Sequence, residues 1–260
     1  MKAEKKTNFT DRIQRGEIIL GDGATGTMLM ERGLKSGEPP EKFNLEHPEI
    51  VTEIAAEYLD AGADIIQTNT FGASPLKLSL YNLEERMDEI IRKAVSAVRE
   101  IDKKHYYISG SCGPSGKILE PYGDTSPEKV YNSFLRQVEV LLDEGVDIIC
   151  IETMIDIREM NEAVKAAKSI STDVPIIATM TFDSTPGGYF TVMGNSIRDF
   201  ADRMNDSGVD LIGSNCGNGI ENMVEIAEEF MKVSSLPIII QSNAGVPEMV
   251  EGKIIYSETP

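Results

Sequence analysis

The sequence Gly208-Val-Asp-Leu-Ile212 occurs with small changes at two earlier places in the chain, and this repeat decides the fold. The other copies are Gly62-Ala-Asp-Ile-Ile66 and Gly145-Val-Asp-Ile-Ile149. In each copy a glycine ends the preceding helix, an acidic residue turns the chain, and an apolar run begins a strand. The repeat therefore predicts strands that follow helices in regular succession.

Apolar runs along the whole chain extend this pattern to seven buried strands. They cover Glu17–Gly21, Asp64–Thr68, Tyr106–Ser109, Asp147–Ile151, Pro175–Phe182, Asp210–Gly213 and Pro237–Gln241. Between them, apolar residues recur at helical spacing within 50–58, 90–101, 130–142, 197–204 and 223–230. Ser126-Pro-Glu128 supplies a helix start, with a capping serine and a proline at the first helical position.

Continuous apolar strands between amphipathic helices indicate a parallel sheet covered by helices. Seven such units favour one (β/α)8 TIM-type barrel domain over residues 1–260, rather than an open doubly wound sheet. Such a barrel needs eight strands, and Val250 to Pro260 leave no room for a further helix and strand. We therefore expect the eighth β/α unit to be missing or incomplete.

Composition excludes several function classes. Hydrophobic residues make up 41% of the chain and the net charge is -18, so we expect a sizeable core and an acidic surface. The chain has no Lys/Arg-rich block, which argues against nucleic acid or an anionic membrane as a partner. No apolar run approaches the ~18 residues of a membrane span. Three distant cysteines do not form a disulfide framework, so we expect a cytoplasmic protein.

Polar and glycine-rich segments follow the predicted strands, whereas the loops before the strands are bland. These segments are Asp22–Thr27, Asn69–Gly72, Cys112–Gly116, Glu152–Met154, Asp183–Gly188, Asn215–Gly219 and Asn243–Gly245. In a barrel the carboxyl ends of the strands converge on one face, where active sites are built. This asymmetry predicts an enzyme with one composite site.

Two carboxylates stand at the ends of predicted strands. Glu152 closes Ile149-Cys-Ile-Glu152, so its side chain should point inward at the barrel mouth, with Cys150 one layer below on the same side. Asp22 ends the first predicted strand in a similar way. Such a pair can bind an ammonium group or act as acid and base. Alternatively, loop amides satisfy each carboxylate.

Cys216 ends another apolar run, among glycines and asparagines, and its thiol could be a zinc ligand, a nucleophile or a filler. The two histidines, His47 and His105, stand at a helix start and before a strand, so we expect no histidine-based triad or metal site. Gly21–Gly26 satisfies G-x-G-x-x-G, but Ser36–Leu45 cannot be the second strand of a dinucleotide fold. These glycines are better suited to a close approach of a small ligand or to a sharp turn.

Together these segments resemble the homocysteine S-methyltransferase family, which includes the homocysteine-binding barrel of cobalamin-dependent methionine synthase and betaine–homocysteine methyltransferase. The matching segments are Asp22–Thr27, Asn44–Glu49, Ala63–Phe71, Gly113–Gly116, Ile151–Thr153, Gly213–Gly217 and Asn243–Gly245. The resemblance covers essentially the whole chain. It implies a methyltransferase that moves a methyl group to a thiol such as homocysteine.

The resemblance also implies the site. Asp22 and Glu152 match positions that hold the substrate's amino end, and we expect them to be the catalytic pair. The other residues expected to bind substrate are Gly23, Thr25, Asn69, Phe71 and Asn215. The family binds one zinc through three cysteines, and zinc removes the proton from the substrate thiol. Cys216 matches one of these ligands, but the other two form an adjacent Cys-Cys pair in the eighth strand, and this sequence has no such pair.

One cysteine cannot hold a catalytic zinc, for which three protein ligands are the norm. Cys112, also at a strand end, is a candidate substitute in a rearranged site. The sequence is compatible with a piece of a longer methyltransferase and with a short relative completed by a partner subunit. It is also compatible with a zinc-independent, corrinoid-linked methyltransferase for another small substrate, and with a non-catalytic small-molecule-binding module. Because the chain has no D-x-H-x-x-G cobalamin signature, we expect a methylcorrinoid donor on another domain or protein.

Overall fold

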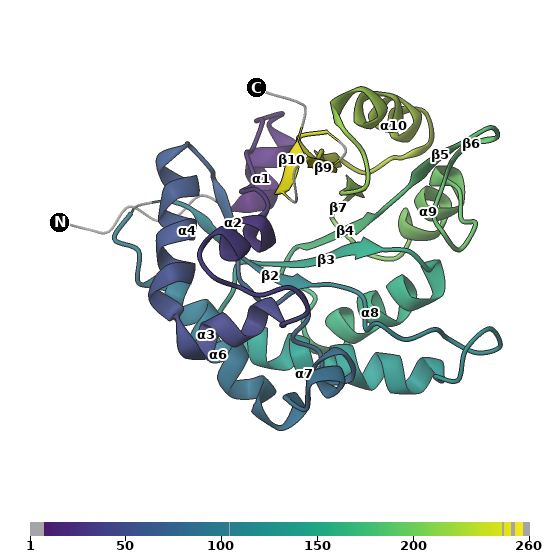
Figure 1. Ribbon diagram of the computed structural model, residues 1–260. Helices are drawn as coiled ribbons and strands as arrows, with labels where there is room; N and C mark the ends of the chain where they lie inside the picture. The colour runs from purple at the N-terminus through teal and green to yellow at the C-terminus, as the bar shows by residue number, and fades with distance from the viewer. Residues whose placement is uncertain (1–7, 104, 246, 251–252, 257–260) are drawn as a thin grey trace.

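The computed structural model describes residues 8–103, 105–245, 247–250 and 253–256, which form a curved sheet with helices on its outer side (Figure 1). The longer helices are α4 (Pro48–Asp60), α6 (Met87–Arg99), α7 (Pro127–Asp143), α8 (Ile157–Ile170), α9 (Ile197–Met204) and α10 (Ile220–Val233). The shorter ones are α1 (Phe9–Gln14), α2 (Thr25–Glu31), α3 (Phe43–Glu46) and α5 (Pro75–Leu78), with 3-10 turns at Pro40–Lys42, Ser79–Tyr81 and Glu84–Arg86. Within the described residues, no helix combines the length and the hydropathy that a membrane crossing requires.

The five predicted helical stripes are confirmed as α4, α6, α7, α9 and α10. The predicted start of α7 is also confirmed, because Ser126 caps the helix by accepting a hydrogen bond from the Lys129 N–H and Pro127 occupies the first turn. Helix α8 is not among the predicted stripes, although its residues Met160, Ala163 and Ala167 pack in the core.

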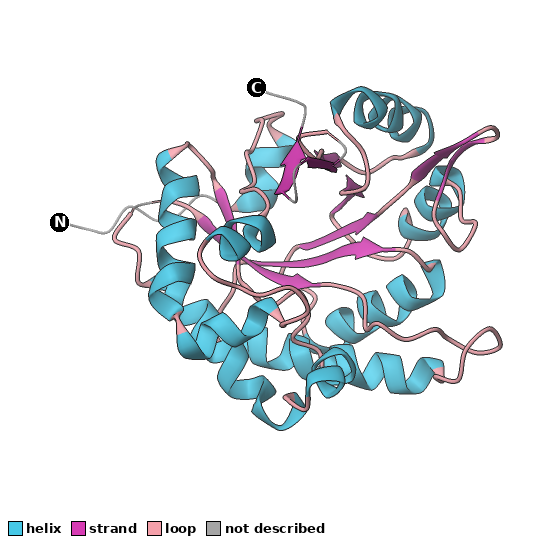
Figure 2. Cartoon of the chain, in the orientation of Figure 1, coloured by secondary structure: helices cyan, strands magenta, loops and turns pink. Residues whose placement is uncertain are grey.

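Six parallel strands form the main sheet in the order β1-β2-β3-β4-β7-β8. They are β1 (Ile65–Gln67), β2 (Tyr107–Cys112), β3 (Ile148–Met154), β4 (Ile176–Met180), β7 (Leu211–Asn215) and β8 (Ile238–Gln241). Each strand lies beside the previous strand of the sheet and is connected to it through at least one helix, as in β/α barrels. The sheet curls into an incomplete TIM-type barrel, which confirms the predicted fold class (Figure 2).

Successive residues of each strand alternate between the helices and the barrel interior. In β3, Ile149 and Ile151 pack in the main core with the helices, whereas Ile148 and Cys150 belong to a second cluster inside the barrel. Helix α1 contributes Phe9 to this inner cluster, and the Phe9 ring lies 5.4 Å from the Tyr107 ring at the start of β2. Helix α1 therefore packs against the amino ends of the strands, opposite the mouth that the carboxyl ends form.

The repeated Gly-x-Asp segments explain how neighbouring strands align. Their glycines, each within four residues of a helix end, all have positive φ, 102° for Gly62, 69° for Gly145 and 84° for Gly208, a region that favours glycine. Each following aspartate makes a reciprocal pair with one residue of the preceding strand segment. The aspartate N–H donates to that residue's carbonyl, and the carboxylate accepts its N–H at 2.7–3.0 Å. The pairs are Asp64 with Leu20, Asp147 with Ile108, and Asp210 with Ile176.

The first predicted strand, Glu17–Gly21, is wrong as a strand. Only Gly21 forms a bridge, to Ile65 of β1, although Leu20 makes the reciprocal contact with Asp64 described above. Ile18 is 86% exposed. Strand β8 lies at the other edge of the sheet and is half-buried along its length. Among the described residues no strand pairing joins residues 17–21 to β8, although the Gln241 side chain of β8 lies close to Gly21.

Two antiparallel hairpins lie in segments for which we predicted no strands. One lies in the polar segment after the strand predicted over Pro175–Phe182, and the other lies near the end of the described chain. The strand predicted over Pro175–Phe182 ends at Met180, and β5 (Asp183–Thr185) and β6 (Gly188–Phe190) form a hairpin in the loop that follows. Strands β9 (Pro247–Val250) and β10 (Lys253–Tyr256) form the second hairpin. The remaining residues of the stretch from Val250 to Pro260 lie outside the described part of the chain.

Candidate functional site

The barrel mouth gathers polar residues that lie at or near the carboxyl ends of four strands. Gln67, Ser111, Glu152 and Asn215 end or nearly end β1, β2, β3 and β7. Hydrogen bonds connect them across the barrel, because Ser111 and Asn215 both donate to Glu152. Four segments that are far apart in sequence therefore form one polar network.

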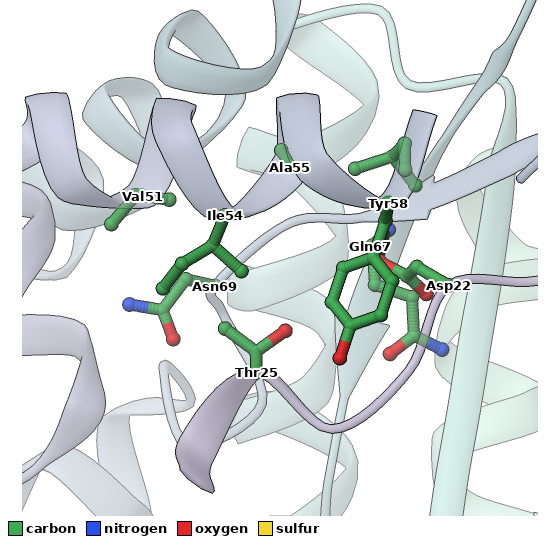
Figure 3. Close-up of a pocket in the computed structure, with 9 residues that line it drawn as sticks. Asp22, Thr25, Val51, Ile54, Ala55, Tyr58, Gln67 and Asn69 are labelled. Atoms are coloured by element: carbon green, nitrogen blue, oxygen red, sulfur yellow. Dashed lines mark hydrogen bonds between the residues drawn. The ribbon is translucent and has the colours of Figure 1, made fainter. Parts of the chain in front are cut away.

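Asp22 lies beside β1 and is buried, with 9% of its surface exposed. Its Oδ2 atom accepts a hydrogen bond of 2.7 Å from the Gln67 backbone N–H. Burial raises the pKa of Asp22 to about 7, and the negative charge of Glu152 adds to the rise against the opposing effect of the Gln67 hydrogen bond. Asp22, Gln67 and Tyr58 lie close together around a cavity of about 10 Å³, which is room for about one water molecule (Figure 3).

Glu152 is the second buried carboxylate of the mouth and points inward as predicted, one layer above Cys150. Its Oε1 atom accepts a hydrogen bond from the Ser111 hydroxyl, and its Oε2 atom accepts one of 3.3 Å from the Asn215 side-chain amide. Burial raises the pKa of Glu152 to about 6, although hydrogen bonds from Ser111 and Gln67 oppose the rise. Gln67 thus contacts both carboxylates, one through its backbone and the other through its side chain.

Asn215 is the hub of this network. Its Oδ1 atom accepts from the Thr153 backbone N–H at 3.0 Å and from the Thr179 hydroxyl at 2.8 Å. Its Nδ2 atom donates to Glu152, to the Thr153 hydroxyl and, at 3.5 Å, to the Cys216 sulfur. Thr153 has a φ of 59°, which is unusual for a β-branched residue. The Asn215 side chain therefore fixes a strained turn directly after Glu152.

Cys216 follows β7 immediately and is exposed. Its φ is 60°, and its backbone N–H donates to the Gln241 carbonyl of β8 at 3.2 Å. Although the residue reaches solvent, partial burial of the thiol and the charge of Glu152 raise its pKa above the ordinary value. Cys216 is thus an accessible thiol at the edge of the carboxylate network.

The other two thiols do not join Cys216 at the mouth. Cys150 lies inside the barrel below Glu152, and Cys112 packs on the opposite face of the sheet against the helices. Burial raises the pKa of both thiols well above the ordinary value. Cys112 and Cys150 are thus small core residues, as expected, and Cys112 is not a substitute ligand because alternation along β2 turns its side chain away from the mouth. No group of three or more His, Cys, Asp or Glu side chains suited to a metal occurs in the described part of the chain.

The remaining predicted site residues surround the network with different contacts. Asn69 uses its side-chain amide to donate to the Pro40 carbonyl and to Asn44, at 2.8 and 2.9 Å, so it ties two segments together. Thr25 begins α2 and lines the cavity beside Asp22. A Cβ atom on Gly23 would lie 2.8 Å from the Tyr58 hydroxyl, which requires glycine there. Their roles in substrate binding stay predictions, as do those of Asp22, Glu152 and Asn215.

Ser111, Gln67 and Thr179 belong to the network but were not predicted from the sequence. Each occupies an inward position near the end of its strand, in line with Glu152 and Asn215. Alternation along each strand gives its inward positions, but the register between the strands decides which of these positions reach Glu152. Neither histidine is part of the network, since His47 begins α4 and contacts Phe43, and His105 precedes β2 at the other end of the barrel.

A model of the homocysteine S-methyltransferase family matches residues 19–260. The chain belongs to the homocysteine S-methyltransferase family. Among curated relatives, it is 29% identical to the methionine synthase of Mycobacterium tuberculosis over 93% of this chain and 21% of that protein. It is 28% identical to the methionine synthase of Mycobacterium leprae, over 88% of this chain and 20% of that protein. The chain thus spans about a fifth of the length of these relatives.

Two solved structures of a homocysteine methyltransferase have the same fold as the present chain. The oxidized form of the homocysteine methyltransferase MmuM from Escherichia coli superposes with a TM-score of 0.76 at 23% identity, covering 91% of this chain and 87% of that chain. The metallated form gives a TM-score of 0.73, also at 23% identity, over 87% and 84% of the two chains. These similarities agree with the barrel described above.

Proposed function

We propose that the chain binds homocysteine, or a closely similar amino-acid thiol, at the barrel mouth and holds its sulfur for attack on a methyl donor. The observation that supports this proposal is the buried carboxylate pair, Asp22 and Glu152, which shares Gln67 and lies next to the exposed Cys216. The names of the relatives, methionine synthase and homocysteine methyltransferase, agree with it.

The carboxylate pair is suited to an ammonium group. Two buried acids near each other are costly to ionise, which is why the pKa values of Asp22 and Glu152 are raised. Neither forms an ion pair with a lysine or arginine in the described part of the chain, so the pair lacks a cation of its own. A substrate amino group would supply that charge through charge-assisted hydrogen bonds.

In the transfer, a sulfur–carbon bond forms while the bond between the methyl carbon and the donor breaks, and the thiol proton must leave. A carboxylate with a pKa of about 6 or 7 is able to accept a proton near neutral pH. Asp22 and Glu152 therefore provide both roles expected of the pair, which are holding the amine and taking up a proton. Phe71, Thr25 and Gly23 would shape the space around the ligand.

The residues described do not fit a zinc site by themselves. Cys216 is the single accessible thiol of the described mouth, and a catalytic zinc needs about three protein ligands. We therefore assign no step of the reaction to zinc on this chain. If zinc activates the substrate sulfur, as the resemblance implies, two further ligands must reach Cys216 from a following segment or a partner subunit.

We further propose that the methyl donor is a methylcorrinoid carried by another domain or protein. The chain lacks the D-x-H-x-x-G signature of cobalamin binding, and its relatives are much longer methionine synthases. The accessible free thiol of Cys216 fits a reducing cytoplasm.

Calorimetric titration of the purified chain with L-homocysteine tests substrate binding, and incubation with methylcobalamin or a methylated corrinoid protein tests methyl transfer by the mass of the product. Binding with turnover supports the proposed enzyme, and binding without turnover under any donor supports a non-catalytic module. Absence of binding, with or without added zinc, would sink the proposal. Metal analysis of the chain and of Cys216→Ala measures zinc directly.

A further inference from the structure

Two more buried carboxylates, Glu41 and Glu159, lie beside the mouth loops without belonging to the Asp22–Glu152 pair. Each side chain is only 2% exposed. Glu41 belongs to the 3-10 turn before α3, and Glu159 to the first turn of α8. Burial raises the pKa of both, because removal from water makes the charged form of each carboxyl costly.

Glu41 holds the loop that follows β1. Its Oε1 atom accepts a hydrogen bond from the backbone N–H of Gly72. A Cβ atom on residue 72 would lie 2.9 Å from the same oxygen, so glycine is required for this close approach. The carboxylate thereby fixes the backbone directly after Phe71.

Glu159 holds the loop that follows β2 in the same way. Its Oε1 atom accepts a hydrogen bond of 2.7 Å from the backbone N–H of Ser115, which is fully buried. Glu159 extends from α8, which follows β3. The contact therefore ties the loop after one strand to the helix after the next.

Phe71 and Gly113 join the two held loops. The Gly113 N–H donates to the Phe71 carbonyl at 2.8 Å, and a Cβ atom on Gly113 would lie 2.4 Å from the Phe71 ring. One side of the ring thus lies directly against Gly113 of the second loop, with 37% of Phe71 exposed. Lys77 is close to both carboxylates, since its charge lowers the pKa of Glu41 and of Glu159 against the effect of burial.

We propose that Glu41 and Glu159 are positioning residues that hold the two mouth loops by backbone amides and so fix Phe71 as one wall of the substrate pocket. The role in substrate binding rests on the proposed function. The holding of the loops does not. The geometry favours carboxylates here, because a charged acceptor makes a shorter and stronger hydrogen bond to a backbone N–H than a neutral one does.

Hydrogen–deuterium exchange tests the holding of the loops without any ligand. In Glu41→Leu the amide of Gly72 should exchange at least roughly tenfold faster, while the amides of β3 keep their protection. Glu159→Leu should have the same effect at Ser115. Glu41→Gln and Glu159→Gln, which keep an acceptor of the same length, should restore most of the protection. The matched control is Glu53→Leu, at an exposed glutamate of α4. Unchanged exchange at Gly72 and Ser115 in the leucine variants overturns the proposal.

Calorimetric titration with L-homocysteine tests the second part. Glu41→Leu and Glu159→Leu should weaken the Kd by roughly tenfold, with rescue in the glutamine variants and no change in Glu53→Leu. Gly113→Ala displaces the Phe71 ring with both carboxylates intact, so it should weaken binding while Gly72 and Ser115 stay protected, even if a leucine variant fails to fold. Lost protection with an unchanged Kd shows a merely structural role and overturns the positioning. A wild-type chain that does not bind homocysteine overturns the proposed function and the substrate role with it, whereas the exchange result still decides whether the carboxylates hold the loops.

Discussion

The two sides of the barrel mouth differ in how many hydrogen bonds their polar side chains make to the described residues. On the carboxylate side, Asp22, Glu152 and Asn215 are buried, and each makes hydrogen bonds to a neighbouring strand or turn. On the thiol side, Cys216 is exposed, has a left-handed backbone and receives one weak contact from Asn215. Both sides lie within one hydrogen-bonded network.

This difference separates two tasks within one site. The carboxylate side is organised before any ligand arrives, because its hydrogen bonds are made within the protein. The thiol side lies beside β8 at the edge of the sheet, where the Cys216 N–H donates to the Gln241 carbonyl. Binding of the amino end should therefore respond to substitutions of Asp22 and Glu152, and metal binding, where it occurs, to substitution of Cys216.

The largest effect is expected from removing both charges on the carboxylate side. Asp22→Asn combined with Glu152→Gln should weaken binding of L-homocysteine by roughly a thousandfold, because two charge-assisted hydrogen bonds to the amine are lost. Calorimetry measures the change, and 4-mercaptobutyrate, which lacks the amino group, should bind both proteins alike. Asp206→Asn, at an exposed aspartate, is the control. Equal loss of both ligands would contradict amine recognition.

The next effect is a gain in stability with a defined pH dependence. The pKa of Asp22 rises from 3.8 to about 7 on folding, so between these values the folded protein retains a proton that the unfolded chain releases. Stability should therefore fall as pH rises from about 4 to 7. Asp22→Asn removes this cost, and the variant should exceed the wild type by about 4 kcal/mol at pH 8 and by little at pH 4. Denaturant unfolding at both pH values checks the prediction, and a constant difference would refute it.

A smaller loss is expected at the hub. Asn215→Ala leaves the Thr153 N–H and the Thr179 hydroxyl without their acceptor, so the free energy of unfolding should fall by about 2 kcal/mol. Cys216→Ala should change it by less than about 0.5 kcal/mol, since the side chain is exposed. Similar losses in the two variants would show that the two sides are not organised differently.

The smallest effect is expected from relieving backbone strain at Cys216 and Thr153, the two non-glycine mouth residues with positive φ. Cys216→Gly should raise the free energy of unfolding by about 0.5 kcal/mol, because glycine relieves the strain at a φ of 60°. Thr153→Gly relieves similar strain but loses the 2.8 Å hydrogen bond from Asn215, so it should not stabilise. Thermal unfolding of the two variants side by side distinguishes strain that is free to relax from strain that the network holds.

Local signals in the sequence predicted most of the fold. The Gly-x-Asp repeats and the helical stripes depend on residues within one turn or strand, so they predicted the barrel class and the inward direction of Glu152. The segment Glu17–Gly21 failed because an apolar run forms a strand only where neighbours pair with it. The hairpin of β5 and β6 was missed because nothing in Asp183–Gly188 distinguishes it from a loop.

The site could be predicted only in part for a related reason. Asp22, Glu152 and Cys216 were found because each stands at the end of an apolar run. Ser111 was missed because its place beside Glu152 depends on the register between β2 and β3, which no local pattern in the sequence sets. Glu41 and Glu159 left no signal, since a glutamate in a turn or a first helical turn is ordinarily a surface residue.

The aspartates of the Gly-x-Asp segments divide the wall into two-strand modules. Leu20 is joined to the start of β1, β2 to β3, and β4 to β7, each through one reciprocal aspartate contact. Strand β8 is left as the first half of a fourth module, with no described aspartate facing Ile238. For protein engineering this sets a simple rule for extending the sheet. A strand grafted beside β8 should begin with glycine, any residue and aspartate, in the register that places the aspartate opposite Ile238.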